Sequence, residues 1–213
     1  RDAQESRGLG DVYKRQVLAT DLSLTDFTFW IGFAAMLAST MFFFSAMNMV
    51  ADKWKTSMLV SALITGIAAL HYYYMRNAAM EGDITTAYRY VDWILTVPLM
   101  CVEFYLILKP SGATKSLLWK LIALSTVMLV TGYFGEAGIG PLDAQLWGLV
   151  SGIAYFAIVA EIFFGGASKL AASAGGNVAY AHKLLCRFVL IGWAIYPIGY
   201  MAGTDAVSYT HLR

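Results

Sequence analysis

Six long apolar stretches dominate the sequence and constrain the fold more than any other feature. A helix needs about 20 mostly apolar residues to cross the hydrocarbon core of a bilayer. Six stretches reach that length, at Phe27–Val50, Lys55–Met75, Thr86–Leu108, Leu117–Phe134, Leu142–Gly165 and Leu184–Ala202. The connections between them are short, so neighbouring helices are expected to run antiparallel. The pattern predicts an all-α integral membrane protein.

The composition supports a membrane protein and excludes several other classes. Of 213 residues, 59% are hydrophobic and 14% are charged, whereas soluble proteins carry about 25% charged residues. The net charge of +1 gives no reason to expect nucleic acid as a partner. Cys101 and Cys186 lie in apolar runs and are expected to pack as free thiols. The three histidines are scattered and no Cys/His cluster exists, which predicts no metal site.

The basic residues predict the orientation in the membrane. The first, third and fifth connections and the helix ends beside them carry most of these residues: Lys53, Lys55, Lys109, Lys115, Lys120, Lys169, Lys183 and Arg187. The second and fourth connections carry Arg76 beside four acidic residues. The odd-numbered connections are therefore expected in the cytoplasm and the N-terminus outside.

Both ends of the chain have an unusual sequence. Back-translation of the last six residues of Ser6–Gln16 gives a DNA string whose reverse complement matches the end of the Ala206 codon followed by the codons of Val207–Leu212. Two ends of one gene should not be related in this way, and both strings resemble a sequencing adapter. We therefore expect adapter-derived or disordered sequence at residues 1–16, a transmembrane domain at 17–205 and an adapter-derived tail at 206–213.

The third apolar stretch carries ionisable residues, which are costly inside a membrane and are functional candidates by default. Arg89 and Asp92 are three residues apart and can pair, and Thr96 can reach the Asp92 carboxylate from the next turn. Glu103 follows Asp92 by three turns on the same stripe, about 16 Å along the axis. Apolar surroundings favour the protonated form of a carboxyl group, so Glu103 is expected to hold a proton at rest. Two carboxyl groups on one stripe could hand protons to a group between them. From the residues alone, a purely structural role fits equally well, in which Arg89 and Asp92 form an ion pair and Glu103 reaches the interface.

Motifs along nearly the whole chain resemble one family. The segment Arg89–Trp93, followed by Thr96–Pro98 and Glu103–Leu106, resembles the third helix of proteorhodopsins, which are microbial rhodopsins. Similar matches in the same order occur in three other helices, at Trp54–Ser57 and His71–Arg76, Gly132–Gly138, and Gly192–Pro197. Each motif alone is weak, but their order and spacing together are specific. The resemblance implies a seven-helix bundle, of which this chain carries six helices.

The resemblance implies roles for the third helix. In this family, retinal is held as a protonated Schiff base on a lysine of the seventh helix. Asp92 matches the proton acceptor and counter-ion, and Glu103 matches the cytoplasmic proton donor. Thr96 completes the signature of the proton pumps, and Arg89 and His71 match partners of the counter-ion. The implied function is a light-driven outward proton pump, which is not an enzyme.

The resemblance also implies a retinal pocket and a cellular setting. The pocket residues would be Trp93, Met100, Tyr155, Trp193, Tyr196 and Pro197. Tyr155 stands where the family often has tryptophan, and an apolar Met100 suggests absorption of green light. The expected setting is the bilayer of a bacterial inner membrane, with protons as the transported ion and a homo-oligomer as the assembly.

The sequence departs from the family in one respect. The native lysines are expected in loops or at helix ends, so this chain has no candidate for the Schiff-base lysine in the centre of the bundle. We expect that truncation removed the seventh helix and that the chain alone does not bind retinal covalently.

Three alternatives to a pump stay open. A sensory rhodopsin is the nearest, although sensors often lack a carboxylic donor such as Glu103. A six-span channel or transporter without a chromophore would usually show polar residues on several spans or broken paired helices. An inert membrane scaffold would leave the charges of the third helix without a purpose.

Overall fold

Helices account for nearly all of the chain that the computed structural model describes, which is residues 24–81, 85–196 and 198, with only the backbone of residue 25. No strand occurs in these ranges. The long helices are α2 (Leu24–Ala46), α3 (Asp52–Glu81), α4 (Thr86–Leu108), α5 (Lys115–Glu136) and α6 (Ala144–Phe164). They are followed by α7 (Gly166–Ala174) and α8 (Gly176–Arg187). A 3₁₀ turn, η1 (Lys109–Ser111), follows α4, and a π-helical turn, η2 (Phe188–Gly192), continues α8.

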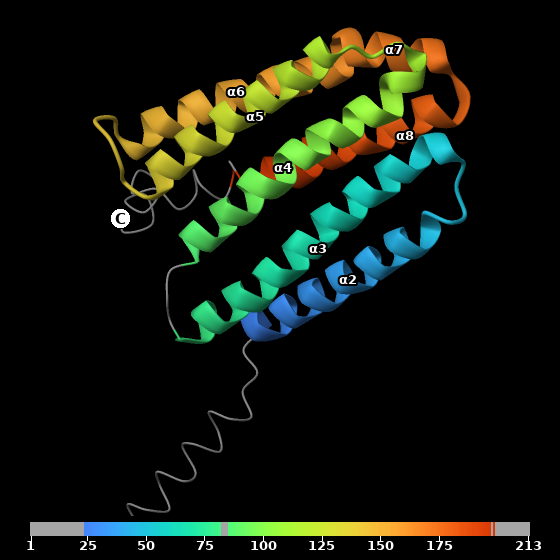
Figure 1. The fold of residues 1–213 in the computed structure, drawn as a ribbon. Coiled ribbons are helices and arrows are strands. Elements are labelled where there is room, and N and C mark those ends of the chain that lie inside the picture. Colours follow the sequence, from blue (N-terminus) through green and yellow to red (C-terminus); the bar gives the residue numbers. More distant parts are fainter. Residues whose placement is uncertain (1–23, 82–84, 197, 199–213) are drawn as a thin grey trace, which may run out of the picture.

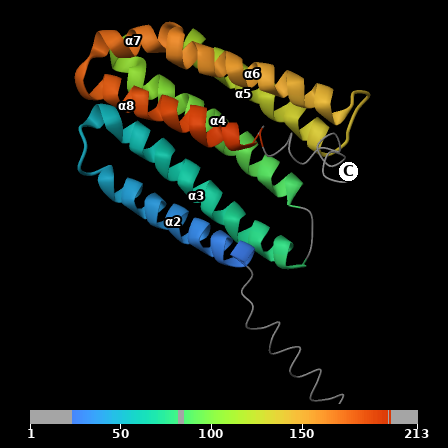
Figure 2. The ribbon, with the colours of Figure 1, turned by 180° about the vertical axis from the view of Figure 1, so that it is seen from behind.

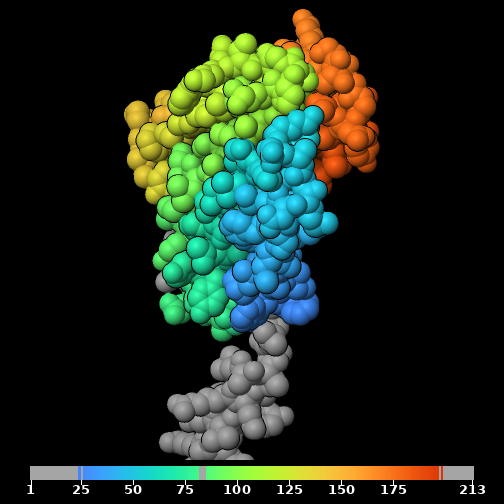
Figure 3. Space-filling view, turned by 45° about the vertical axis from the view of Figure 1, so that its right-hand side comes forward, coloured from blue at the N-terminus to red at the C-terminus, as the bar shows by residue number. Residues whose placement is uncertain are grey.

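The helices form an elongated bundle in which α4 is central (Figure 1). Each of α2 to α5 packs against the next helix in the chain, and α8 returns to lie beside α4 (Figure 2). Helix α4 therefore contacts α3, α5 and α8. Figure 3 shows α2 and α3 side by side on one face of the bundle, with α7 and α8 at its edge. We call the two ends of the bundle the Asp92 end and the Glu103 end, after the buried carboxyl groups of α4.

The predicted spans agree with the structure in number. Among the described residues, six helices are long and apolar enough to cross a membrane. Helix α4 has the predicted bounds, whereas α3 continues beyond Met75 to Glu81. The fold class is therefore confirmed as an all-α membrane bundle.

The region between the fifth and sixth predicted spans is the main departure from prediction. It contains α7, and α8 begins at Gly176 rather than at Leu184. The first turns of α8 expose polar residues such as Asn177 and Lys183, so an apolar run does not reveal them. They nevertheless bury His182, which is 3% exposed. Packing on one face, not hydropathy, extends this helix.

Several predictions fall outside the described residues. These are the adapter-like segments 1–16 and 206–213, the end of the sixth span beyond residue 198, and the pocket residue Pro197. The predicted free thiols lie within the described part. Cys101 and Cys186 are both free and buried, as predicted.

The main hydrophobic core lies toward the Glu103 end. Its buried members come from α4, α5, α6, α7 and α8 with η2, and include Phe104, Leu108, Leu121, Tyr155 and Ile162. Leu108 and Ile162 are completely enclosed. The core therefore fixes the half of α4 that carries Glu103.

Candidate functional site

Two carboxyl groups of α4 face the interior of the bundle. Asp92 is 6% exposed and Glu103 is 8% exposed. They are separated by three helical turns, which corresponds to about 16 Å along the axis. Ionisable side chains inside a membrane usually face the bundle interior and mark a functional path. Helix α4 therefore carries an acid group near each end of its interior face.

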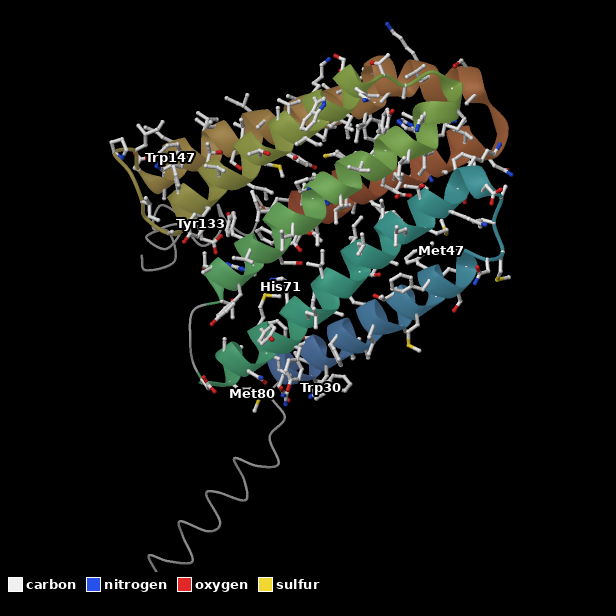
Figure 4. The ribbon with its side chains drawn as sticks, in the orientation of Figure 1. Trp30, Met47, His71, Met80, Tyr133 and Trp147 are labelled. Atoms are coloured by element: carbon white, nitrogen blue, oxygen red, sulfur yellow. The ribbon has the colours of Figure 1, made fainter. Side chains whose placement is uncertain are left out.

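Asp92 has an incomplete set of partners. His71 lies on α3 (Figure 4). Its Nδ1 atom is 3.6 Å from Asp92 Oδ1. That separation is longer than a hydrogen bond, and the same Nδ1 atom lies 2.9 Å from the backbone oxygen of Ile67. Among the described residues, Asp92 Oδ1 has no hydrogen-bond partner although it is buried. A buried acceptor of this kind can take a hydrogen bond from ordered water or from a bound group.

The predicted contact between Thr96 and the Asp92 carboxylate is wrong. The Thr96 hydroxyl donates instead to the backbone carbonyl oxygen of Asp92, at 2.9 Å. Threonine in a helix commonly bonds the carbonyl four residues earlier, because that oxygen is nearest to its hydroxyl. Thr96 is buried, and its hydroxyl donates no hydrogen bond to the Asp92 carboxylate.

The predicted pair between Arg89 and Asp92 is also not the one in the structure. The Arg89 guanidinium pairs with Glu136, the last residue of α5. The hydroxyl of Thr86 donates to the same carboxylate oxygen at 3.0 Å. Spacing within α4 put Arg89 within reach of Asp92, but the packing of α5 against α4 supplies a nearer acid. Sequence reasoning placed Glu136 only among the acidic residues of an outer connection, although it also lies within one of the family motifs.

Glu103 has a hydroxyl partner on the neighbouring helix. The Ser57 hydroxyl, on α3, donates to Glu103 Oε1. Ser57 is itself buried. The other carboxyl oxygen, Oε2, is buried and has no hydrogen-bond partner among the described residues. The sequence contained Ser57 within a family motif, but its contact with Glu103 across 46 positions could not be read from spacing.

Aromatic side chains gather beside Asp92. The rings of Trp93 and Tyr196 meet edge to face, with centroids 4.6 Å apart. Trp193 packs against the core, and Met100 is half-buried on α4. Tyr155 is buried in the same core but makes a polar contact, because its hydroxyl donates to the backbone carbonyl of Leu190 in η2. Of the five described pocket candidates, Trp93 and Met100 lie on α4, and Trp193 and Tyr196 lie in the helical residues that follow η2.

The lysines of the described part lie away from Asp92. They lie toward the Glu103 end, in connections or in the first turns of helices that begin there. These residues are Lys53, Lys55, Lys109, Lys115, Lys120, Lys169 and Lys183. Asp92 lies three helical turns of α4 from Glu103, toward the opposite end of the bundle. None of these amines forms an ion pair with Asp92.

These features define a class of protein. The chain is a multi-pass helical membrane protein whose central helix carries buried acids at two depths. The chain belongs to the bacteriorhodopsin-like family, whose model matches residues 23–212.

Individual relatives give the same result. The chain is 45% identical over 188 residues to a green-light absorbing proteorhodopsin from Gamma-proteobacterium EBAC31A08, covering 86% of this chain and 75% of that protein. It is 42% identical to blue light-absorbing proteorhodopsin from Med12, whose crystal structure superposes with a TM-score of 0.72 and coverages of 86% and 83%. Xanthorhodopsin, described as a light-driven ion pump with dual chromophore, is 34% identical with a TM-score of 0.74, at coverages of 84% and 78%.

Proposed function

We propose that the complete protein is a light-driven outward proton pump that uses retinal, and that this chain supplies its proton acceptor, Asp92, and its proton donor, Glu103. The observation that carries the proposal is the pair of buried carboxyl groups on one face of α4. Each has an oxygen without a hydrogen-bond partner among the described residues. Similarity to proteorhodopsins and to a light-driven ion pump supports the same function.

The residues near Asp92 fit retinal. A buried acceptor oxygen suits a cationic N–H donor, and the flat rings of Trp93 and Tyr196 suit a conjugated chain. Trp193, Met100 and the Asp92 side chain would hold the group in place. Retinal, bound as a protonated Schiff base on a lysine, would supply the light-driven change in proton affinity. Because the described lysines lie toward the Glu103 end, we propose that a seventh helix of the complete protein provides the attachment.

The side chains of this chain then have distinct tasks. Asp92 takes up a proton at Oδ1, and His71, at 3.6 Å, steadies the charge that Asp92 carries when ionised. The ion pair of Arg89 and Glu136 lies at the same end and would receive protons that leave Asp92. Glu103 holds a proton beside Ser57 until the interior requires one. Protons thus move from the Glu103 end toward the Asp92 end.

Outward pumping requires the Glu103 end to face the cytoplasm, as the basic residues at that end predict. We infer a bacterial inner-membrane location, an external N-terminus and a homo-oligomer on the same grounds of resemblance and charge.

A cysteine introduced at exposed Ile139, between α5 and α6, should react with an impermeant thiol reagent added outside intact cells. One introduced at exposed Ser173, in α7, should react only after lysis.

A fusion protein tests the function directly. The last membrane-spanning helix of the green-light absorbing relative would follow residue 205, and the fusion would be expressed in bacterial cells with all-trans retinal. Illumination should acidify the medium, and a protonophore should abolish the signal. Asp92→Asn should eliminate pumping, and Glu103→Gln should slow it by about 100-fold, the usual contribution of a positioned proton-transfer group. A visible absorption band without acidification would refute the pump and favour a photoreceptor.

The chain without the added helix is the matched control. With retinal, its washed membranes should show no red-shifted band. A stable band would mean that one of the described lysines forms the Schiff base, and the proposed seventh-helix attachment would then be wrong.

A further inference from the structure

A single side-chain hydroxyl connects α6 to the backbone of η2, the π-helical turn that follows α8. The Tyr155 hydroxyl lies 2.9 Å from the carbonyl oxygen of Leu190 and 3.4 Å from that of Val189. The shorter contact has the length of a good hydrogen bond. Tyr155 is only 4% exposed, so neither lipid nor bulk water competes for this hydroxyl.

The acceptor carbonyls belong to irregular backbone. Residues Phe188–Gly192 form the π-helical turn, which widens the helix relative to the α-helical segments on either side. Such turns disturb the regular ladder of backbone hydrogen bonds and are frequent at functional sites. A side-chain donor that reaches into the disturbed region can fix one of its possible geometries.

The turn determines where Trp193 lies. Trp193 is the first residue after η2, and its backbone N–H donates to the carbonyl of Val189. Trp193 packs against the same core cluster that contains Tyr155 and Val189. A change in the winding of η2 would therefore rotate the Trp193 ring relative to α6.

We propose that Tyr155 is a positioning residue whose hydroxyl holds η2 in its π-helical form and thereby fixes the ring of Trp193. The inference rests on the proposed function only where Trp193 is taken as a neighbour of retinal. A role limited to filling space would need the ring of Tyr155 but not its hydroxyl. The bond to Leu190 distinguishes the two roles, because phenylalanine keeps the ring and loses the bond.

The test compares Tyr155→Phe with the unchanged chain in lipid nanodiscs, without retinal or light. Tyr180→Phe is the matched control, because Tyr180 lies on α8 but is 67% exposed. The first measurement is hydrogen exchange of the amides in residues 188–196. Loss of one hydrogen bond predicts about five-fold faster exchange there in Tyr155→Phe and no change in Tyr180→Phe. The second measurement is ¹⁹F NMR of 5-fluorotryptophan, which gives one signal for each of the six tryptophans.

The fluorine signal of Trp193, assigned by its loss in Trp193→Phe, should shift or broaden in Tyr155→Phe. The signal of Trp119, which is 64% exposed on α5, should not change. Unchanged exchange, or faster exchange with an unchanged Trp193 signal, overturns the proposal. Failure of the fusion protein to pump would leave these outcomes intact, because none of them depends on retinal.

Discussion

Substitution of Ile162 by alanine should destabilise the bundle much more than the same substitution at Ile153. Both residues lie on α6. Ile162 is 0% exposed within the core that holds the Glu103 end of α4, whereas Ile153 is 62% exposed. The comparison separates packing against protein from contact with lipid, because the helix and the chemical change are the same.

The expected magnitude follows from the contacts that are lost. A buried aliphatic side chain of this size makes about 40–60 heavy-atom contacts worth about 0.1–0.2 kcal/mol each. Alanine retains one of four side-chain carbons, so the gross loss is roughly 3–9 kcal/mol. Neighbouring groups relax into part of the cavity, and comparable changes in soluble cores cost about 2–5 kcal/mol. Lipid is as apolar as the core, so the transfer part of that cost largely disappears, and we expect about 2–3 kcal/mol for Ile162→Ala.

The assay is reversible unfolding in mixed micelles with increasing sodium dodecyl sulfate, followed by far-ultraviolet circular dichroism. Ile153→Ala should change the free energy of unfolding by no more than about 0.5 kcal/mol, the usual range for a surface position. Equal effects at the two positions would refute the reasoning, because they would mean that α6 does not bury Ile162 against the other helices in the bilayer.

Three further predictions concern the polar contacts. Ser57→Ala should lower the free energy of unfolding by about 1–2 kcal/mol, because the buried Oε1 of Glu103 loses the Ser57 hydroxyl as a donor. An unchanged unfolding midpoint in the same micelles would contradict this contact. A double-mutant cycle of Glu136→Gln and Arg89→Gln should give a coupling energy of about 0.5–1 kcal/mol. The value is modest because both side chains are about one-third exposed. A coupling energy near zero would argue against the ion pair. Asp143→Ala should lower the free energy of unfolding by about 1 kcal/mol and speed hydrogen exchange in the first turn of α6. The reason is that the Asp143 carboxylate accepts the Leu146 N–H at 2.7 Å. Unchanged exchange in that turn would exclude Asp143 as the helix cap.

Comparison of α4 with α8 indicates how far hydropathy alone predicts helix bounds. Helix α4 is apolar over nearly its whole length, so its predicted and observed ends coincide at Thr86 and Leu108. The first turns of α8 are polar on one face, and only their packing keeps them helical. The helix α7 was missed for a related reason, since its nine residues are too few to form an apolar span.

The candidate site divides in the same way. The periodicity of α4 was enough to predict that Asp92 and Glu103 share a face, because both residues lie on one regular helix. The partners of the charged and polar groups could not be predicted. Ser57 and Glu136 come from other helices, and several acceptors were within reach of each long side chain.

The sequence by itself determined the number of spans, the helical class and the stripe of ionisable residues, because lipid requires long apolar helices and a helix has a fixed period. Only the tertiary structure decided that Arg89 pairs with Glu136, that Ser57 bonds Glu103 and that Tyr155 bonds the backbone of η2. Each of these contacts joins two helices. Their choice depends on which faces the packed helices turn toward each other, and that is a property of the whole bundle rather than of any one segment.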